Sequence, residues 1–190
     1  MRFIIVDGID GSGKSTVAGW ISQHYSALGE TVRLQHHPSD RLLGRLSRRF
    51  LRGEGKLMYL LSSAFYLLDV LGSVARLPLW RRRYDSVVFV RYLMATAYLP
   101  DRLASLAYDM FERTLPVPDR LLLVDVEPRS ALSRISMRQD GEEMCESLPA
   151  LIEIREKMLA LARSWRVLDN NGCEGESRER LKEILSTWDD

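Results

Sequence analysis

The chain has 190 residues, 46% of them hydrophobic, which suffices for one well-packed core and leaves little room for a second domain. Its 27 Lys and Arg residues against 26 Asp and Glu residues give a net charge of +1, so no whole-molecule field attracts nucleic acid or anionic lipid. Two cysteines without metal-type spacing argue against a disulfide framework and a zinc site. We therefore expect a single domain, residues 1–190, that binds neither nucleic acid nor membrane.

Short apolar runs alternate with helical patterns along the chain. Residues 3–7 form a continuous apolar run typical of a strand that is buried on both faces of a parallel sheet. Similar runs predict further strands at residues 31–34, 86–90, 120–126 and 166–168. Because parallel strands need long crossover connections, the alternation predicts an α/β fold whose parallel sheet is covered by helices on both faces.

Two apolar stretches bear on where the protein resides. The opening run, residues 1–6, is too short for the apolar core of a signal peptide. The longest predicted helix, residues 56–76, is interrupted by serines and carries Asp69, which is typical of a packed helix and not of a membrane span. We expect a soluble cytoplasmic protein.

The turn after the first strand carries the most specific motif. Residues 8–15 read G-I-D-G-S-G-K-S, a complete Walker A pattern between a predicted strand and a predicted helix. The glycines let backbone N–H groups converge on phosphate, Lys14 neutralises the outer phosphates, and the Ser15 hydroxyl ligates Mg²⁺. We call residues 8–16 the phosphate loop and expect it to bind a nucleoside triphosphate through Gly8, Asp10, Gly11, Ser12, Gly13, Lys14, Ser15 and Thr16. The loop alone does not distinguish kinases from ATPases, GTPases and nucleotide-binding switches. A glycine-rich turn that only joins the strand to the helix is the alternative without nucleotide binding.

Asp10 narrows the field, because DGIDGSGKST resembles the thymidylate kinases, a family of nucleoside monophosphate kinases. Further stretches follow in the family's order: Val90-Arg91-Tyr92 resembles its Asp-Arg-Tyr signature, residues 123–132 its strand before the lid, and residues 168–170 its last strand and adenine loop. The resemblance implies a P-loop NTPase fold with a five-stranded parallel sheet and a mobile lid around residues 134–146. It also implies ATP and Mg²⁺ as cofactors and a homodimer packed through helices, to which we expect Leu60, Leu67 and Leu71 to contribute.

The resemblance also implies roles for single residues. Arg91 holds the acceptor phosphate, Arg134 and Arg138 are the lid arginines that stabilise transferred charge, and Asn170 touches adenine. Asp10 accepts a hydrogen bond from an acceptor hydroxyl. Read without the family, Arg134 and Arg138 are ordinary solvated residues at i, i+4 on one helix face.

A stripe of arginines precedes the longest helix. Arg41, Arg45, Arg48 and Arg52 follow helical spacing, with Leu42, Leu46 and Phe50 on the neighbouring, packed face. We expect Arg41 or Arg45 to make a second contact to the acceptor phosphate. A solvated face accounts for the remaining arginines.

The acceptor side departs from the family pattern. The family's stacking phenylalanine matches Phe65, but the arginine four residues later, which donates to thymine, is replaced by Asp69. The family's base-reading glutamine is absent from residues 95–100, ATAYLP, where Tyr98 offers a hydroxyl to the acceptor instead. The signature aspartate is replaced by Val90. A carboxylate facing a thymine carbonyl is unfavourable, so the departures suggest an altered acceptor.

The sequence therefore predicts an ATP-dependent kinase that phosphorylates a nucleoside monophosphate. Two alternatives remain open at this point: a P-loop kinase that acts on a phosphorylated small molecule other than a nucleotide, and a non-catalytic ATP-binding switch. Loss of the aspartate at position 90 favours the switch, and the lid arginines argue against it.

Overall fold

The computed structural model describes residues 1–53, 55–137 and 147–189. Its five strands are β1 (Arg2–Asp7), β2 (Val32–His36), β3 (Ser86–Val90), β4 (Arg120–Asp125) and β5 (Arg166–Asp169). The helices are α1 (Lys14–Ala27), α2 (Leu42–Leu51), α3 (Lys56–Val74), α4 (Leu77–Trp80), the 3₁₀ turn η1 (Met94–Tyr98), α5 (Asp101–Thr114), α6 (Pro128–Ser136), α7 (Leu148–Leu161) and α8 (Glu174–Asp189). All five predicted strands are present, with ends that differ from the prediction by at most two residues.

The strands form one parallel sheet in the order β2-β3-β1-β4-β5. Successive residues of a strand point to opposite faces, so a continuous apolar run can fill two cores. In β1, Ile4 and Val6 face one core while Phe3 and Ile5 face the other. The predicted five-stranded parallel sheet with helices on both faces is confirmed.

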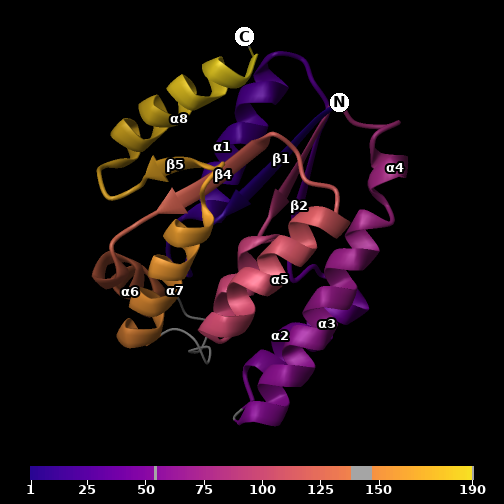
Figure 1. Cartoon of the computed structure of the whole chain (residues 1–190). Helices are drawn as coiled ribbons and strands as arrows, with labels where there is room; N and C mark the ends of the chain where they lie inside the picture. Colours follow the sequence, from indigo (N-terminus) through magenta and orange to yellow (C-terminus); the bar gives the residue numbers. More distant parts are fainter. Residues whose placement is uncertain (54, 138–146, 190) are drawn as a thin grey trace.

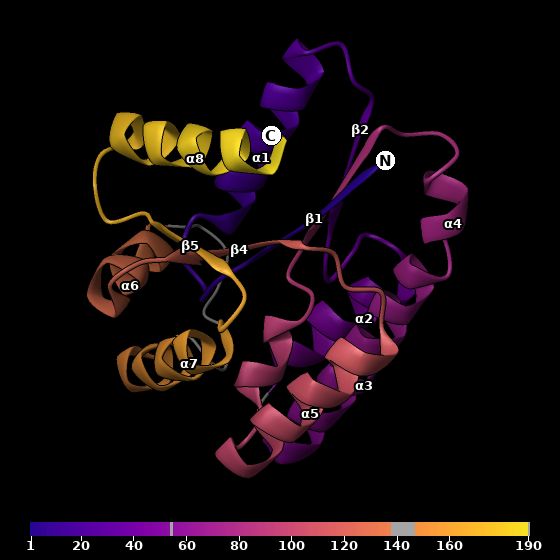
Figure 2. The same cartoon turned by 45° about the horizontal axis from the view of Figure 1, so that its top comes forward.

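The two faces of the sheet carry unequal covers. Figures 1 and 2 show α1 and α8 on one face, while the remaining helices lie on the other. Ile21 of α1 and Leu181 of α8 fill the smaller core, and Trp80, Tyr108 and Met158 contribute to the larger one. The helices that form the site's walls lie over the larger core, and they follow the carboxyl ends of β2 and β3.

The pair α2 and α3 packs differently from the prediction. Leu42, which we expected on the packed face, is 65% exposed, whereas Gly44 and Ser47 are buried. A Cβ at Gly44 would lie 2.1 Å from the Ser39 carbonyl oxygen, so only glycine lets the preceding loop cross α2 this closely. Ser47 then meets Ser62 of α3, and a polar seam joins the two helices.

The stretch Leu57–Trp80, spanning α3 and α4, is long and apolar enough to cross a membrane by length and composition alone. In the fold it contributes Val70, Leu77 and Trp80 to the core beside the sheet. Only 22% of its most apolar window is buried, so α3 also presents an apolar outer face.

Candidate active site

The phosphate loop joins the end of β1 to the start of α1 in a turn that non-glycine residues rarely adopt. Gly11 and Gly13 have φ of 76° and 88°, both in the left-handed region. Gly13 is the N-cap of α1, so the first N–H groups of that helix have no partners within the helix. A bent glycine backbone that ends on a helix N-terminus is the arrangement that binds phosphate.

Lys14 lies folded over this loop and is buried. Its ammonium donates to the Ile9 carbonyl at 3.0 Å and to Asp10 Oδ1 at 3.2 Å. Burial and the nearby Arg91 charge lower the pKa of Lys14 to about 8, against the opposing pull of Asp10. Ser15 and Thr16, the next two residues, are exposed. The loop therefore presents a partly desolvated cation beside accessible hydroxyls.

Asp10 connects the phosphate loop to the elements opposite. Its carboxylate accepts hydrogen bonds from Lys14, from the Arg91 guanidinium and, at 2.7 Å, from the Tyr98 hydroxyl. Burial alone would raise the pKa of Asp10, but the charges of Arg91 and Lys14 outweigh it and hold the pKa well below its usual range. Asp10 is therefore ionised at neutral pH and can orient cations, whereas it is a poor proton acceptor.

Arg91 directly follows β3 in an uncommon backbone conformation, with φ of 65°. Its carbonyl oxygen accepts from the Tyr66 hydroxyl at 2.8 Å and faces His37 Nδ1 at 3.1 Å, while its own N–H donates to the Val6 carbonyl at 3.0 Å. Burial lowers the pKa of His37 to about 4, so its ring is neutral near pH 7 and Nδ1 can donate to that carbonyl. These contacts hold the backbone that aims the Arg91 side chain at Asp10.

Asp7 is a site residue that the sequence reasoning missed. It ends β1, is fully buried, and accepts from the backbone N–H groups of Tyr92 at 3.1 Å and Met94 at 3.2 Å. Burial raises its pKa to about 6, opposed by those two hydrogen bonds. The only signal in the sequence was a carboxylate closing an apolar strand directly before the glycine motif. Asp7 fixes the chain that leaves Arg91.

Arg134 and Asn170 approach the phosphate loop from the opposite side. Asn170 Nδ2 donates to the Ser12 carbonyl at 2.7 Å, and Arg134 donates to the Asn170 carbonyl at 2.9 Å. Arg134 lies near the end of α6, which stops at Ser136. The second predicted lid arginine, Arg138, and the lid segment beyond it lie outside the described residues.

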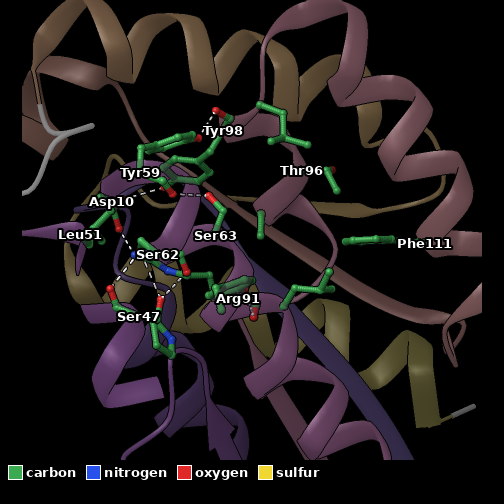
Figure 3. A pocket seen from close by; sticks show the side chains of 15 residues that line it. Asp10, Ser47, Leu51, Tyr59, Ser62, Ser63, Arg91, Thr96, Tyr98 and Phe111 are labelled. Atoms are coloured by element: carbon green, nitrogen blue, oxygen red, sulfur yellow. Dashed lines mark hydrogen bonds and ion pairs between the residues drawn. The ribbon is translucent and has the colours of Figure 1, made fainter. Parts of the chain in front are cut away.

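A cavity of about 210 Å³ opens beside Asp10 and Arg91. Its walls come from α2, α3, η1 and α5, and tyrosines contribute three of its side chains (Figure 3). We call it the tyrosine cavity; it is lined by Asp10, Pro38, Ser47, Leu51, Tyr59, Ser62, Ser63, Tyr66, Leu67, Arg91, Ala95, Thr96, Tyr98, Leu99 and Phe111. Figure 3 shows Asp10 and Phe111 on opposite sides of it, so one end is charged and the other is apolar.

The expected stacking residue, Phe65, lies outside the tyrosine cavity. Its ring stacks on Phe50 of α2 with 5.4 Å between centroids, and it is the next residue, Tyr66, that lines the cavity. The two neighbouring side chains point about 100° apart around the helix, so Tyr66 and not Phe65 reaches the cavity. Four residues after Tyr66 stands Val70, which is buried in the core.

Asp69, Arg41 and Arg45 also lie away from the tyrosine cavity. Asp69 accepts from Ser39 and pairs with Arg41 Nη2 at 3.0 Å, so these charges hold the loop before α2 against α3. Arg45 is exposed on α2. The structure thus gives Asp69 and Arg41 structural partners outside the cavity, whereas we expected both to contact the acceptor. Tyr98, a predicted acceptor contact, lines the cavity, and its hydroxyl donates to Asp10.

Few groups here suit a metal ion. Among the described residues no three His, Cys, Asp or Glu side chains gather into a metal-binding cluster. Ser15 offers an exposed hydroxyl beside Lys14 at the start of α1. Mg²⁺ is commonly held by one or two protein oxygens together with substrate phosphates and water, so this donor set fits Mg²⁺ that arrives with a nucleotide.

Comparisons with known proteins find sequence and structural relatives over almost the whole chain. The sequence model of the family described as thymidylate kinase matches residues 6–179. A thymidylate kinase of Leptospira interrogans is 32% identical over 194 residues, covering 97% of this chain and 94% of the relative. A probable thymidylate kinase of Archaeoglobus fulgidus is 29% identical, with 97% and 95% covered. The solved thymidylate kinase of Candida albicans superposes with a TM-score of 0.74 at 19% identity, covering 99% of this chain and 92% of that one, which supports the fold.

Proposed function

The chain belongs to the thymidylate kinase family, and from that premise we propose that its phosphate acceptor is thymidylate, dTMP. As a member of this family it is a P-loop phosphotransferase that uses ATP to phosphorylate a nucleoside monophosphate. A kinase of non-nucleotide phosphates and a non-catalytic switch are not favoured. The acceptor's base and the roles of single residues are the proposed part.

One observation carries the assignment of roles. Asp10 and Arg91 stand where the phosphate loop meets the tyrosine cavity, and both line that cavity. A triphosphate on the loop and a monophosphate in the cavity would bring their reacting phosphates together at this point. The junction is the place where in-line transfer needs positive charge.

The proposed mechanism is one of positioning and charge cancellation. The N–H groups of the phosphate loop hold the triphosphate, and Lys14 exchanges its contact with the Ile9 carbonyl for the outer phosphates. Arg91 is oriented by Asp10 and by the hydrogen bond from the Tyr66 hydroxyl to its carbonyl, and it holds the acceptor phosphate in line. Arg134 contributes a further cation above the loop. Asp10 stays ionised and orients the cations without accepting the acceptor's proton.

We also propose Mg²⁺ as cofactor, held by Ser15 and by the nucleotide's own oxygens. When bound, the ion would neutralise part of the phosphate charge. Val90 brings no carboxylate to the place where the family signature has one, so Ser15 is the protein ligand to test.

A homodimer in the cytoplasm completes the proposal, with no nucleic acid or membrane partner. Leu57, Leu60, Leu68 and Leu71 are 40% to 66% exposed and lie at helical spacing along α3. A continuous apolar stripe of this kind marks a contact surface. Leu67, which we also expected there, lines the tyrosine cavity instead. Light scattering after size exclusion would test this, because Leu60→Glu should yield monomers while Leu28→Glu, at an exposed leucine at the end of α1, should not.

The experiment for the main proposal is ADP release with ATP, Mg²⁺ and a panel of nucleoside monophosphates. We expect dTMP to stimulate turnover most among the natural monophosphates. Turnover with other monophosphates but not with dTMP would contradict the acceptor assignment and leave the kinase activity intact.

A further inference from the structure

The three tyrosines of the tyrosine cavity direct their hydroxyl protons away from its interior. The Tyr59 hydroxyl donates to the Tyr98 carbonyl at 2.6 Å, and the Tyr66 hydroxyl donates to the Arg91 carbonyl at 2.8 Å. The Tyr98 hydroxyl donates to Asp10 at 2.7 Å. A hydroxyl has one proton to donate, so none of these three groups has a proton left for a ligand.

The smaller hydroxyls of the cavity are committed in the same way. Ser47 and Ser62 each donate to the other's backbone carbonyl at 3.0 Å. Ser63 donates to the Tyr59 carbonyl at 2.9 Å, one helical turn back, and Thr96 donates to the Leu93 carbonyl at 2.9 Å. Each of these hydroxyl protons is therefore donated to a backbone carbonyl of the protein and not to a ligand.

Other side-chain donors are scarce around the cavity. Among the described residues that line it, none is Asn, Gln, Lys, His or Trp, and Arg91 stands at the charged end beside Asp10. The remaining lining is apolar: Pro38, Leu51, Leu67, Ala95, Leu99 and Phe111. The carbonyl oxygens of a pyrimidine placed here would find aromatic rings and lone pairs instead of side-chain N–H or O–H groups.

We propose that this kinase recognises the acceptor's base by shape and apolar contact, without side-chain N–H or O–H groups that donate to the carbonyl oxygens of the base. The proposal rests on the proposed function, since it describes the same acceptor site. Its substrate class is the monophosphate whose base is a flat ring of thymine's size, whatever polar groups that ring carries. Affinity then comes from the phosphate contact at Arg91 and from ring contacts with Tyr59, Tyr66 and Phe111.

A nonpolar isostere gives the decisive test. The full-length protein is assayed with dTMP and with the deoxyribonucleoside monophosphate in which difluorotoluene, a shape mimic without strong hydrogen-bonding groups, replaces thymine. We expect kcat/KM for the two acceptors to agree within about tenfold. A site that reads polar groups rejects the analogue lacking them by about 10⁴-fold. A difference above about tenfold in favour of dTMP would overturn the proposal while leaving the thymidylate assignment standing; inactivity with dTMP itself would overturn both.

Two variants test the same idea from the protein's side. Thr96→Val removes a hydroxyl but keeps its volume, and we expect the ratio of kcat/KM between dTMP and the isostere to change by less than about twofold. A larger change would show that Thr96 reads the base. Phe111→Ala enlarges the apolar end, so kcat/KM for an analogue with a propynyl group in place of thymine's methyl should rise relative to dTMP. An unchanged or lower ratio in a folded Phe111→Ala protein would contradict recognition by shape.

Discussion

The two halves of the active site are built from different parts of the chain and by different means. The phosphate loop is one contiguous turn whose donors are backbone N–H groups, fixed by Gly11 and Gly13 in left-handed conformations. The tyrosine cavity is assembled from α2, α3, η1 and α5, and its character depends on which way each side chain points. Binding of the phosphate donor, ATP, thus depends on local sequence, whereas binding of the phosphate acceptor depends on how helices pack. We call these two halves the donor side and the acceptor side.

This difference explains where the family pattern holds and where it fails. The phosphate loop matches its motif at every fixed position, because the backbone geometry tolerates few alternatives. The tyrosine cavity lacks the family's arginine and glutamine but can still fit the ring of a base, because its shape depends on many side chains together. Asp10 and Arg91 join the halves, so substitutions on either side of that pair should affect different substrates.

The largest effect is expected on the donor side. Lys14→Ala should lower kcat/KM for ATP by about 10³-fold or more, since it removes the charge that faces the outer phosphates. ADP release and direct titration of ATP would measure the loss. The matched control is Lys182→Ala at an exposed lysine of α8, which should behave as wild type. Equal losses of ATP and dTMP affinity in Lys14→Ala would contradict the separation of the two halves.

On the acceptor side, Arg91→Ala should lower kcat/KM for dTMP by about 10²-fold while changing the affinity for ATP far less. Arg91→Lys should recover little, because a single ammonium cannot form the paired contacts of a guanidinium. Arg163→Ala, an exposed arginine between α7 and β5, serves as the control for lost charge. If ATP affinity in Arg91→Ala fell as far as in Lys14→Ala, Arg91 would belong to the donor side.

The donor side should also be distinguishable by pH. The pKa of Lys14 is lowered to about 8, so its ammonium loses the proton above that pH, and the charge needed for phosphate disappears. We expect kcat/KM for ATP to be level with respect to this group at lower pH and to fall by about tenfold per pH unit above pH 8. Lys14→Arg, which keeps its charge, should lack this fall. If kcat/KM for ATP in the wild type stayed level up to pH 10, the proposed role of the Lys14 charge in ATP binding would be refuted.

The smallest effect is expected when the hydrogen bond from Tyr66 to the Arg91 carbonyl is removed. Tyr66→Phe keeps the ring in the tyrosine cavity but removes the hydrogen bond to the Arg91 carbonyl, which should lower kcat/KM for dTMP by about fivefold. The KM for ATP should not change. Tyr92→Phe removes a comparable bond, to the Pro116 carbonyl at 3.3 Å, and should affect neither substrate. A loss for both substrates in Tyr66→Phe would indicate a general change in stability.

Particular residues show how far sequence reasoning reached. The strand at residues 86–90 was predicted with its exact ends, because a fully buried run of β-branched and aromatic residues leaves few alternatives. Asn170 was assigned to the nucleotide side, and the structure brings it to the phosphate loop. Its contact with adenine and the roles of the lid arginines remain predictions.

The acceptor side resisted prediction for a physical reason. Phe65 and Tyr66 are neighbours on α3, and both fit a stacking role, but a rotation of about 100° sends one to Phe50 and the other into the cavity. Asp69 read as a base contact until the fold placed the Ser39 loop and Arg41 against it. Composition cannot reveal either outcome, since each depends on a partner far away in the chain.

The sequence by itself determined the sheet and the phosphate loop, because both follow from local rules: burial of short apolar runs, and glycines where the backbone needs positive φ. Only the tertiary structure decided what the acceptor side offers. The direction of seven hydroxyl protons, from Ser47, Tyr59, Ser62, Ser63, Tyr66, Thr96 and Tyr98, depends on carbonyls and a carboxylate that helix packing brings near them. A hydroxyl's role is set by its nearest acceptor, and that acceptor is a property of the fold.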